Sequence, residues 1–69
     1  MRIIYTIHAR KRMLERGIGE KEVELTLSNP DFVEESLNKT LVASKKIGER
    51  ILKIIYSLQD NKIIIITVC

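Results

Sequence analysis

A histidine and two arginines spaced four residues apart are the residues of this chain with the clearest chemical potential. His8, Arg12 and Arg16 occur in the segment TIHARKRMLERGI, residues 6–18. Positions four apart lie along one side of a helix, so an imidazole and two guanidiniums form a row. An imidazole transfers protons near neutral pH, and a guanidinium binds phosphate through two hydrogen bonds. The row suits phosphodiester chemistry or phosphate binding, and the alternative is a solvated basic face with an incidental histidine.

Metal-independent cleavage of RNA is a reaction that these groups could perform. RNA carries its own nucleophile in the 2′-hydroxyl, so the protein must supply a base, an acid and cations. We predict that His8 is the base or the acid, and that Arg12, Arg16 and the strand residue Lys53 stabilise the charge on phosphorus. His8 is the only histidine. The second proton-transfer group would therefore be a lysine, a tyrosine, an arginine-assisted water molecule or a group of the ribosome. Tyr56 is a weaker candidate among these, because strand alternation places it on the apolar side.

Charge is segregated along the chain. The net charge is +3, but basic side chains concentrate in residues 1–16 and 39–53, and acidic ones in residues 20–35. If the two basic segments meet in space, they form one phosphate-binding surface, to which Lys45 and Lys46 would contribute. If they diverge, they are ordinary solvated faces. One histidine and one cysteine give no usual metal-ligand spacing, so we expect neither a metal nor another cofactor.

The length of 69 residues predicts one small domain, spanning residues 1–69. A domain of this size buries little apolar surface, so a homodimer or a partner chain would add to its core. Cys69 is the only cysteine, which excludes an internal disulfide and favours a reducing compartment. The longest unbroken apolar run, Ile63–Ile66, is far short of the roughly 20 residues that cross a bilayer. We expect a soluble cytoplasmic protein that does not associate with membranes.

The first half of the sequence predicts a short strand and two helices. The strand covers residues 2–5, and Thr6 is a good N-cap for a helix that ends near Arg16, before Gly17. A second helix begins after Gly19 and ends at residues 29–30, where Asn precedes Pro. The buried side of the first helix is assigned to Ala9, Met13 and Leu14.

The second half predicts strands at residues 32–36, 40–46, 50–58 and 63–68, separated by short turns. Tight turns make neighbouring strands antiparallel. The fold class is therefore α+β, with a short N-terminal strand and two helices packed on a mostly antiparallel sheet of four to five strands. The last strand is apolar on both faces, which predicts a central, well-covered position. The face opposite the helices is left for Lys53, Ser57 and either Lys45 or Lys46.

The motif His8-Ala9-x-x-Arg12-Met13-x-x-Arg16-Gly17-Ile18, followed by an acidic helix ending in Asn29-Pro30, resembles the domain-of-unknown-function family 4258. This family is similar to the RelE/ParE-like toxin fold. The resemblance implies a toxin of a toxin–antitoxin pair, which is usually a metal-independent endoribonuclease. Its implied partners are RNA or the ribosome and an antitoxin-like protein. The motif residues carried over are His8, Arg12, Arg16, Gly17 and Thr67. The sequence departs from the family at Gly19, where Ser or Thr is usual, and at Cys69, where an aromatic is common.

Structural roles remain open for the same residues. His8 could bond a strand backbone and orient the first helix, while Arg12 and Arg16 form ion pairs with Glu20 or Asp31. Thr67 could simply be a good strand residue. Three functional classes follow. They are a small ribonuclease of toxin type, a non-catalytic RNA-binding or ribosome-binding module, and a protein-interaction module whose sheet edge pairs with an antitoxin-like chain.

Overall fold

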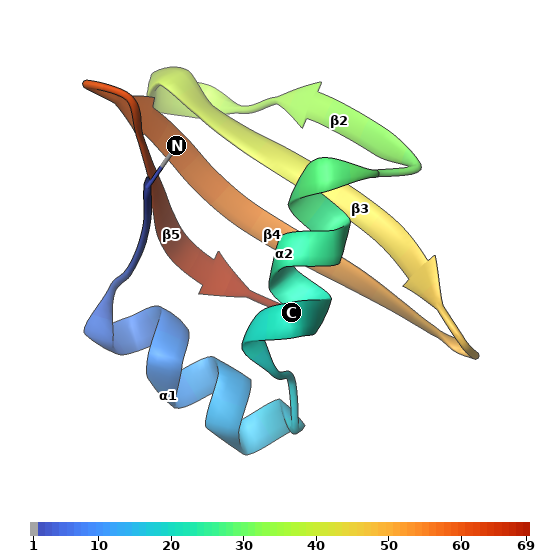
Figure 1. Ribbon diagram of the computed structural model, residues 1–69. Coiled ribbons are helices and arrows are strands. Elements are labelled where there is room, and N and C mark those ends of the chain that lie inside the picture. Colours follow the sequence, from blue (N-terminus) through green and yellow to red (C-terminus); the bar gives the residue numbers. More distant parts are fainter. Residues whose placement is uncertain (1) are drawn as a thin grey trace.

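Five strands form one sheet, and two helices lie against one of its faces (Figure 1). This computed structural model describes residues 2–69. The spatial order is β1-β5-β4-β3-β2; β1 is parallel to β5, and the other neighbours are antiparallel. The predicted α+β fold is confirmed. The elements in chain order are β1 (Arg2–Tyr5), α1 (Ile7–Arg16), α2 (Glu20–Ser28), β2 (Phe32–Glu35), a 3-10 turn (Leu37–Lys39), β3 (Thr40–Ile47), β4 (Arg50–Gln59) and β5 (Lys62–Val68).

Thr6 begins α1 and ties it to the sheet. Its hydroxyl oxygen accepts a hydrogen bond from the Ala9 N–H at 3.1 Å, which is the predicted N-cap bond. The same hydroxyl lies 2.8 Å from the Ile65 carbonyl oxygen, to which it donates, and 3.0 Å from that of Ile66. At the other end, Gly17 adopts the left-handed conformation with φ +64°, which glycine accepts without strain. Both predicted ends of α1 are confirmed.

Local signals also set the bounds of α2. Gly19 is the N-cap and has no side chain to offer, but the Glu22 carboxylate accepts a hydrogen bond from the Gly19 N–H at 3.0 Å. Ile18 and Val23, on either side of this cap, are both buried and fix the angle at which the chain enters the helix. The helix ends at Ser28, and Asn29 is its C-cap, as predicted.

Two-residue turns set the register of β3 with β4 and of β4 with β5. Asp60 and Asn61 connect β4 to β5 with φ values of 49° and 62°, the pattern of a hairpin turn whose twist matches the strands. Gly48, with φ +64°, starts the turn between β3 and β4. Because side chains alternate along each strand, this register decides which residues share a face.

The core lies between the helices and one face of the sheet. Ala9 and Met13 supply the buried side of α1, as predicted, but Leu14 does not, because its side chain is 86% exposed. Successive residues are about 100° apart around a helix, so Arg12 and Leu14 flank Met13 on opposite sides. The helix is rolled so that Arg12 turns toward the sheet and is half-buried, which leaves Leu14 in solvent. The sheet contributes Ala43, Leu52, Ile54, Tyr56, Ile65 and Val68.

No helix covers the opposite face of the sheet within residues 2–69, and we call it the open face. Lys53, Ile55 and Ser57 of β4 lie on it, as predicted from their alternation with the buried Leu52, Ile54 and Tyr56. The last strand, β5, lies between β1 and β4, which confirms its inner position. The prediction that β5 is well covered on both faces is wrong, because Ile64 is only half-buried on the open face.

Candidate functional site

Helix α1 runs beside the last residues of β5. Its first turn is bonded to β5 through Thr6 and the Ile65 carbonyl, and Arg16 at its other end lines a hollow with Cys69. Strand β1 ends opposite Ile65, so residues 66–69 continue without a strand on that side. The rise of about 12 Å from residue 8 to residue 16 of a helix is close to the length of this free segment. Helix α1 therefore packs along the part of β5 that has no strand on that side.

The row of His8, Arg12 and Arg16, which we call the basic row, lies on the flank of α1 that points away from α2. The opposite flank is marked by Arg10, whose guanidinium lies 4.1 Å from the ring centroid of Tyr5 and pairs with Glu20 of α2. Because residues 8 and 10 are about 200° apart around a helix, His8 points away from that contact. The His8 side chain is exposed. Four residues turn through about 400°, so each later member of the row is rotated by about 40° further toward the sheet.

The structural roles considered for the basic row are not formed within residues 2–69. Arg10, and not Arg12 or Arg16, pairs with Glu20, while Asp31 pairs with Lys45. The contact between α1 and the strand backbone is made by the Thr6 hydroxyl, and no hydrogen bond of His8 accompanies it. The imidazole and both guanidiniums are thus left without a carboxylate partner in the described part of the chain.

A hollow of about 340 Å³, which we call the arginine hollow, lies where α1 ends. Arg50 closes it by donating from Nη1 to the Arg16 carbonyl at 3.0 Å and from Nη2 to the Gly17 carbonyl at 3.1 Å. Arg50 also pairs with Glu22 at 3.3 Å, so its charge is partly balanced. Its role is to bind the free carbonyls at the end of α1, while the charge of Arg16 stays available. The lining residues are Arg16, Ile18, Arg50, Ile51, Leu52 and Cys69.

A second hollow, of about 420 Å³, contains all three lysines singled out in the sequence, and we call it the lysine hollow. Within residues 2–69, Lys46 and Lys53 are exposed and make no ion pair. Ile51 lines both hollows. Arg16 of the first basic segment lines one of them, and Lys46 and Lys53 of the second basic segment line the other. The lining residues are Asp31, Phe32, Ser44, Lys45, Lys46, Ile51 and Lys53.

Lys45 differs from the other two lysines. It pairs in register with the buried Leu52, so it lies on the helix side of β3, and its side chain is only 15% exposed. Its Nζ lies 3.7 Å from Asp31 Oδ1, and Asp31 Oδ2 accepts a hydrogen bond from the Lys46 N–H at 2.8 Å. Lys46, the neighbour on the open face, is the lysine whose charge faces solvent.

Thr67 and Tyr56 occupy contrasting positions. Thr67 pairs with Ile55 and is half-buried on the open face, one residue beyond the Ile66 carbonyl that approaches Thr6. It therefore lies near the start of α1. Tyr56 is 9% exposed on the helix side, and burial raises the pKa of its phenol. Its position removes Tyr56 from the accessible proton-transfer groups.

Sequence reasoning gave no role to two residues of this surface. Phe32, at the start of the edge strand β2, is 71% exposed and lines the lysine hollow. Arg50 joins the β3–β4 hairpin to α1 over a separation of 34 residues. Neither has a local motif that marks it. A phenylalanine directly after Pro30-Asp31, in a strand with no other aromatic residue, is the single signal that was available.

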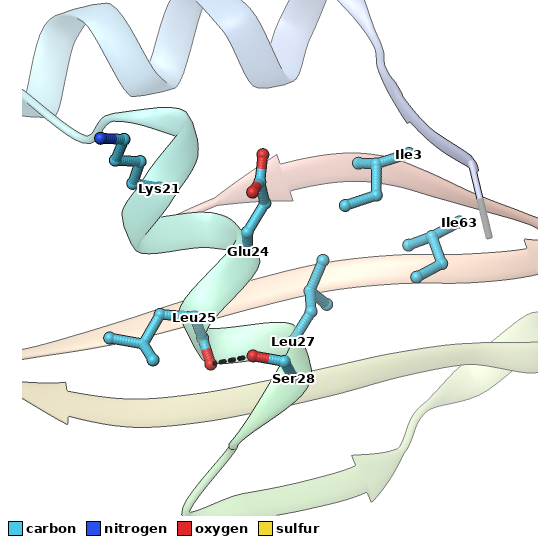
Figure 2. Close-up of a pocket in the computed structure, with 7 residues that line it drawn as sticks. All are labelled: Ile3, Lys21, Glu24, Leu25, Leu27, Ser28 and Ile63. Atoms are coloured by element: carbon cyan, nitrogen blue, oxygen red, sulfur yellow. Dashed lines mark hydrogen bonds between the residues drawn. The ribbon is translucent and has the colours of Figure 1, made fainter.

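A groove of about 530 Å³ lies elsewhere, between α2 and the strands β1 and β5 (Figure 2). Leu27 points toward Ile3 and Ile63 across it, while Lys21 and Glu24 stand at the end nearer α1 (Figure 2). The Ser28 hydroxyl there is bonded to the Leu25 carbonyl at 3.3 Å. This groove is mainly apolar and contains none of the residues singled out in the sequence.

Residues 2–69 contain no group of three or more His, Cys, Asp or Glu side chains placed to hold a metal ion. No helix among them is both long and apolar enough to cross a membrane.

Comparison with known proteins adds a family. The family described as Domain of unknown function (DUF4258) matches residues 5–69. The chain belongs to this family. The resemblance noted in the sequence is thereby confirmed at the level of the family, and the matched part of this DUF4258 chain includes the basic row and both hollows. No curated protein and no solved structure matches the DUF4258 chain significantly.

Proposed function

We propose that the protein is a metal-independent endoribonuclease of toxin type that holds RNA along one basic surface. This surface, the basic track, consists of the basic row, the arginine hollow and the lysine hollow. The observation that carries the proposal is that Ile51 lines both hollows, with Arg16 of the first basic segment in one and Lys46 and Lys53 of the second segment in the other. Cations on a continuous surface bind a phosphate backbone with a strength that falls as salt rises.

The unpaired charges support this use of the track. Within residues 2–69, Arg12, Arg16, Lys46 and Lys53 make no ion pair, whereas Arg10, Lys45 and Arg50 do. A basic side chain that already faces a carboxylate contributes less to binding an anion than one that does not. Among the described residues, Arg12, Arg16, Lys46 and Lys53 are therefore the cations of the track that are free to pair with phosphate, while Lys45 and Arg50 are held by carboxylates within it.

In the proposed reaction the imidazole of His8 takes the proton of a 2′-hydroxyl. The 2′ oxygen then bonds to the adjacent phosphorus, and the bond from phosphorus to the 5′ oxygen breaks. A water molecule protonates the leaving 5′ oxygen, and His8 returns its proton to the hydroxide that remains. The products are a 2′,3′-cyclic phosphate and a 5′-hydroxyl. Arg12 and Arg16 stabilise the negative charge that builds on the phosphoryl oxygens.

The RelE/ParE-like fold, a cytoplasmic location and an antitoxin-like partner belong to the same proposal. Two helices on one face of a mostly antiparallel sheet are the arrangement that the family resemblance implies. The ribosome is a second proposed partner, because it could present messenger RNA to the track and supply the group that protonates the leaving oxygen.

Two alternatives each have an observation in their favour. A non-catalytic RNA-binding or ribosome-binding module is favoured by His8, which forms no hydrogen bond to an orienting group within residues 2–69. A protein-interaction module is favoured by β2, an edge strand whose four residues are all exposed and whose free side could pair with another chain.

Induced expression in a bacterial host tests the proposal. We expect the wild-type protein to arrest growth and to generate new messenger RNA ends, and the His8→Ala variant to do neither at the same protein level. Lys21→Gln is the matched control, because Lys21 is an exposed cation on α2, outside the track. Harmless expression of the folded wild-type protein would contradict a toxin. Equal arrest by wild type and His8→Ala would contradict the role of the imidazole.

A further inference from the structure

We propose that the lysine hollow is a stacking site for one unpaired base of single-stranded RNA, with Phe32 as its platform. This inference rests on the proposed function, because it takes RNA as the molecule on the basic track. It specifies that the RNA is single-stranded. It also adds Phe32, a residue that binds through its ring and not through a charge.

The position of Phe32 is the first argument. It pairs with Ser44 on β3, and Ser44 pairs with Lys53 on β4, so the three side chains form a line across the open face. Phe32 is 71% exposed and is absent from the buried core. The exposed ring lines the same hollow as Lys46 and Lys53, which are unpaired within residues 2–69, so an aromatic face and cations are offered together to a ligand.

The charge of the hollow is the second argument. Asp31 balances Lys45, whose side chain is largely buried, and leaves Lys46 and Lys53 as the unpaired cations of the hollow among the described residues. The apolar part of its lining consists of Phe32 and Ile51, which is 62% exposed. An apolar protein segment would leave the two ammonium groups without partners. A nucleotide satisfies both requirements, because its base stacks on the ring and its phosphate pairs with lysine.

The form of the nucleic acid follows from this chemistry. In the interior of a duplex both faces of every base are covered by its neighbours, so no interior base has a face free to lie on Phe32. An unpaired base has a free face, and stacking is tolerant of base identity because every base has a π-surface. The hollow, at about 420 Å³, lies within the size range of pockets that hold small organic ligands. From it the strand would pass Ile51 toward Arg16 and the basic row.

The test compares binding of a fluorescent single-stranded RNA oligonucleotide with binding of the same sequence as a duplex. The oligonucleotide carries 2-aminopurine, whose emission is quenched by stacking. We expect Phe32→Leu to weaken single-strand binding about 5-fold to 150-fold, the range of one base–aromatic stack, and to remove the quenching. Phe32→Tyr should restore both. Leu14→Ala is the matched control, because Leu14 is 86% exposed and lies on the outer side of α1.

The outcomes separate this inference from the proposed function. If the wild-type protein binds neither oligonucleotide at low salt, the proposed function fails and the stacking site fails with it. If the wild type binds single strand and duplex equally and Phe32→Leu changes neither, the stacking site is wrong while RNA binding stands. Lys53→Gln should lower the slope of log affinity against log salt by about 0.7 with quenching retained, which distinguishes the phosphate contact from the stack.

Discussion

Removing the Thr6 hydroxyl should destabilise the protein more than a surface substitution does. In Thr6→Ala, α1 loses the N-cap bond to the Ala9 N–H, and such a loss costs about 0.5–2 kcal/mol. The variant also loses the bond of 2.8 Å to the Ile65 carbonyl, a net contribution of about 0.5–1.5 kcal/mol. The Thr6 N–H still donates to that carbonyl at 3.2 Å, so the oxygen is not left unpaired. The expected loss is about 2 kcal/mol of unfolding free energy.

Urea denaturation followed by far-ultraviolet circular dichroism measures this loss. Thr6→Ser keeps the hydroxyl and should remain within about 0.5 kcal/mol of the wild type, because serine is an equally good cap. Thr6→Val keeps the shape without the polar group and should resemble Thr6→Ala. Values for Thr6→Ala and Thr6→Val within about 0.5 kcal/mol of the wild type would refute the reasoning. The start of α1, and with it the position of His8, would then depend on other contacts.

Three further predictions concern the elements that hold the track. Met13→Ala should cost about 2–4 kcal/mol in urea denaturation, and the neighbouring Leu14→Ala less than about 0.5 kcal/mol, because Met13 is buried and Leu14 is exposed. Arg50→Met should lower stability by about 1 kcal/mol, because the carbonyls at the end of α1 lose their donor; an unchanged midpoint would contradict that role. Tyr5→Phe should raise the unfolding free energy by about 1 kcal/mol, because the buried Tyr5 hydroxyl has no partner within residues 2–69. Burial first, and then Glu20 and Glu24, raise the pKa of Tyr5 above its ordinary value of 10.0. The unfolded chain therefore ionises first, stability falls as the pH rises above 10.0, and this fall should be smaller in Tyr5→Phe.

The ends of the helices were predictable because they depend on local backbone chemistry. Thr6 caps α1 through a residue three positions away, and Gly17 ends it through its own φ angle. The roll of α1 was not predictable from its own sequence. Leu14 and Arg12 are equally near Met13 around the helix, and the packing of α1 against β5 decides which of them turns inward.

The candidate site was partly predictable for a related reason. The spacing of His8, Arg12 and Arg16 is local, and strand alternation requires Lys45 and Lys46 to lie on opposite faces. The meeting of Lys53 with Phe32 depends on the pairing of β2 with β3, which fixes residue 32 opposite residue 44. The register of a strand pair depends on the whole sheet. The residues of a single exposed strand such as β2 contain little information about which register it adopts.

Mapping of RNA ends after incubation with purified protein tests most directly whether the basic track cleaves RNA. The substrates are a free messenger RNA and the same RNA on ribosomes. A metal chelator is added to the free RNA, and to the ribosomes at concentrations that leave them assembled. We predict new ends that carry a 2′,3′-cyclic phosphate with the wild-type protein, and their loss in a His8→Gln variant that still binds the RNA. The absence of new ends on both substrates, with wild-type protein bound to them, would contradict catalysis by this surface.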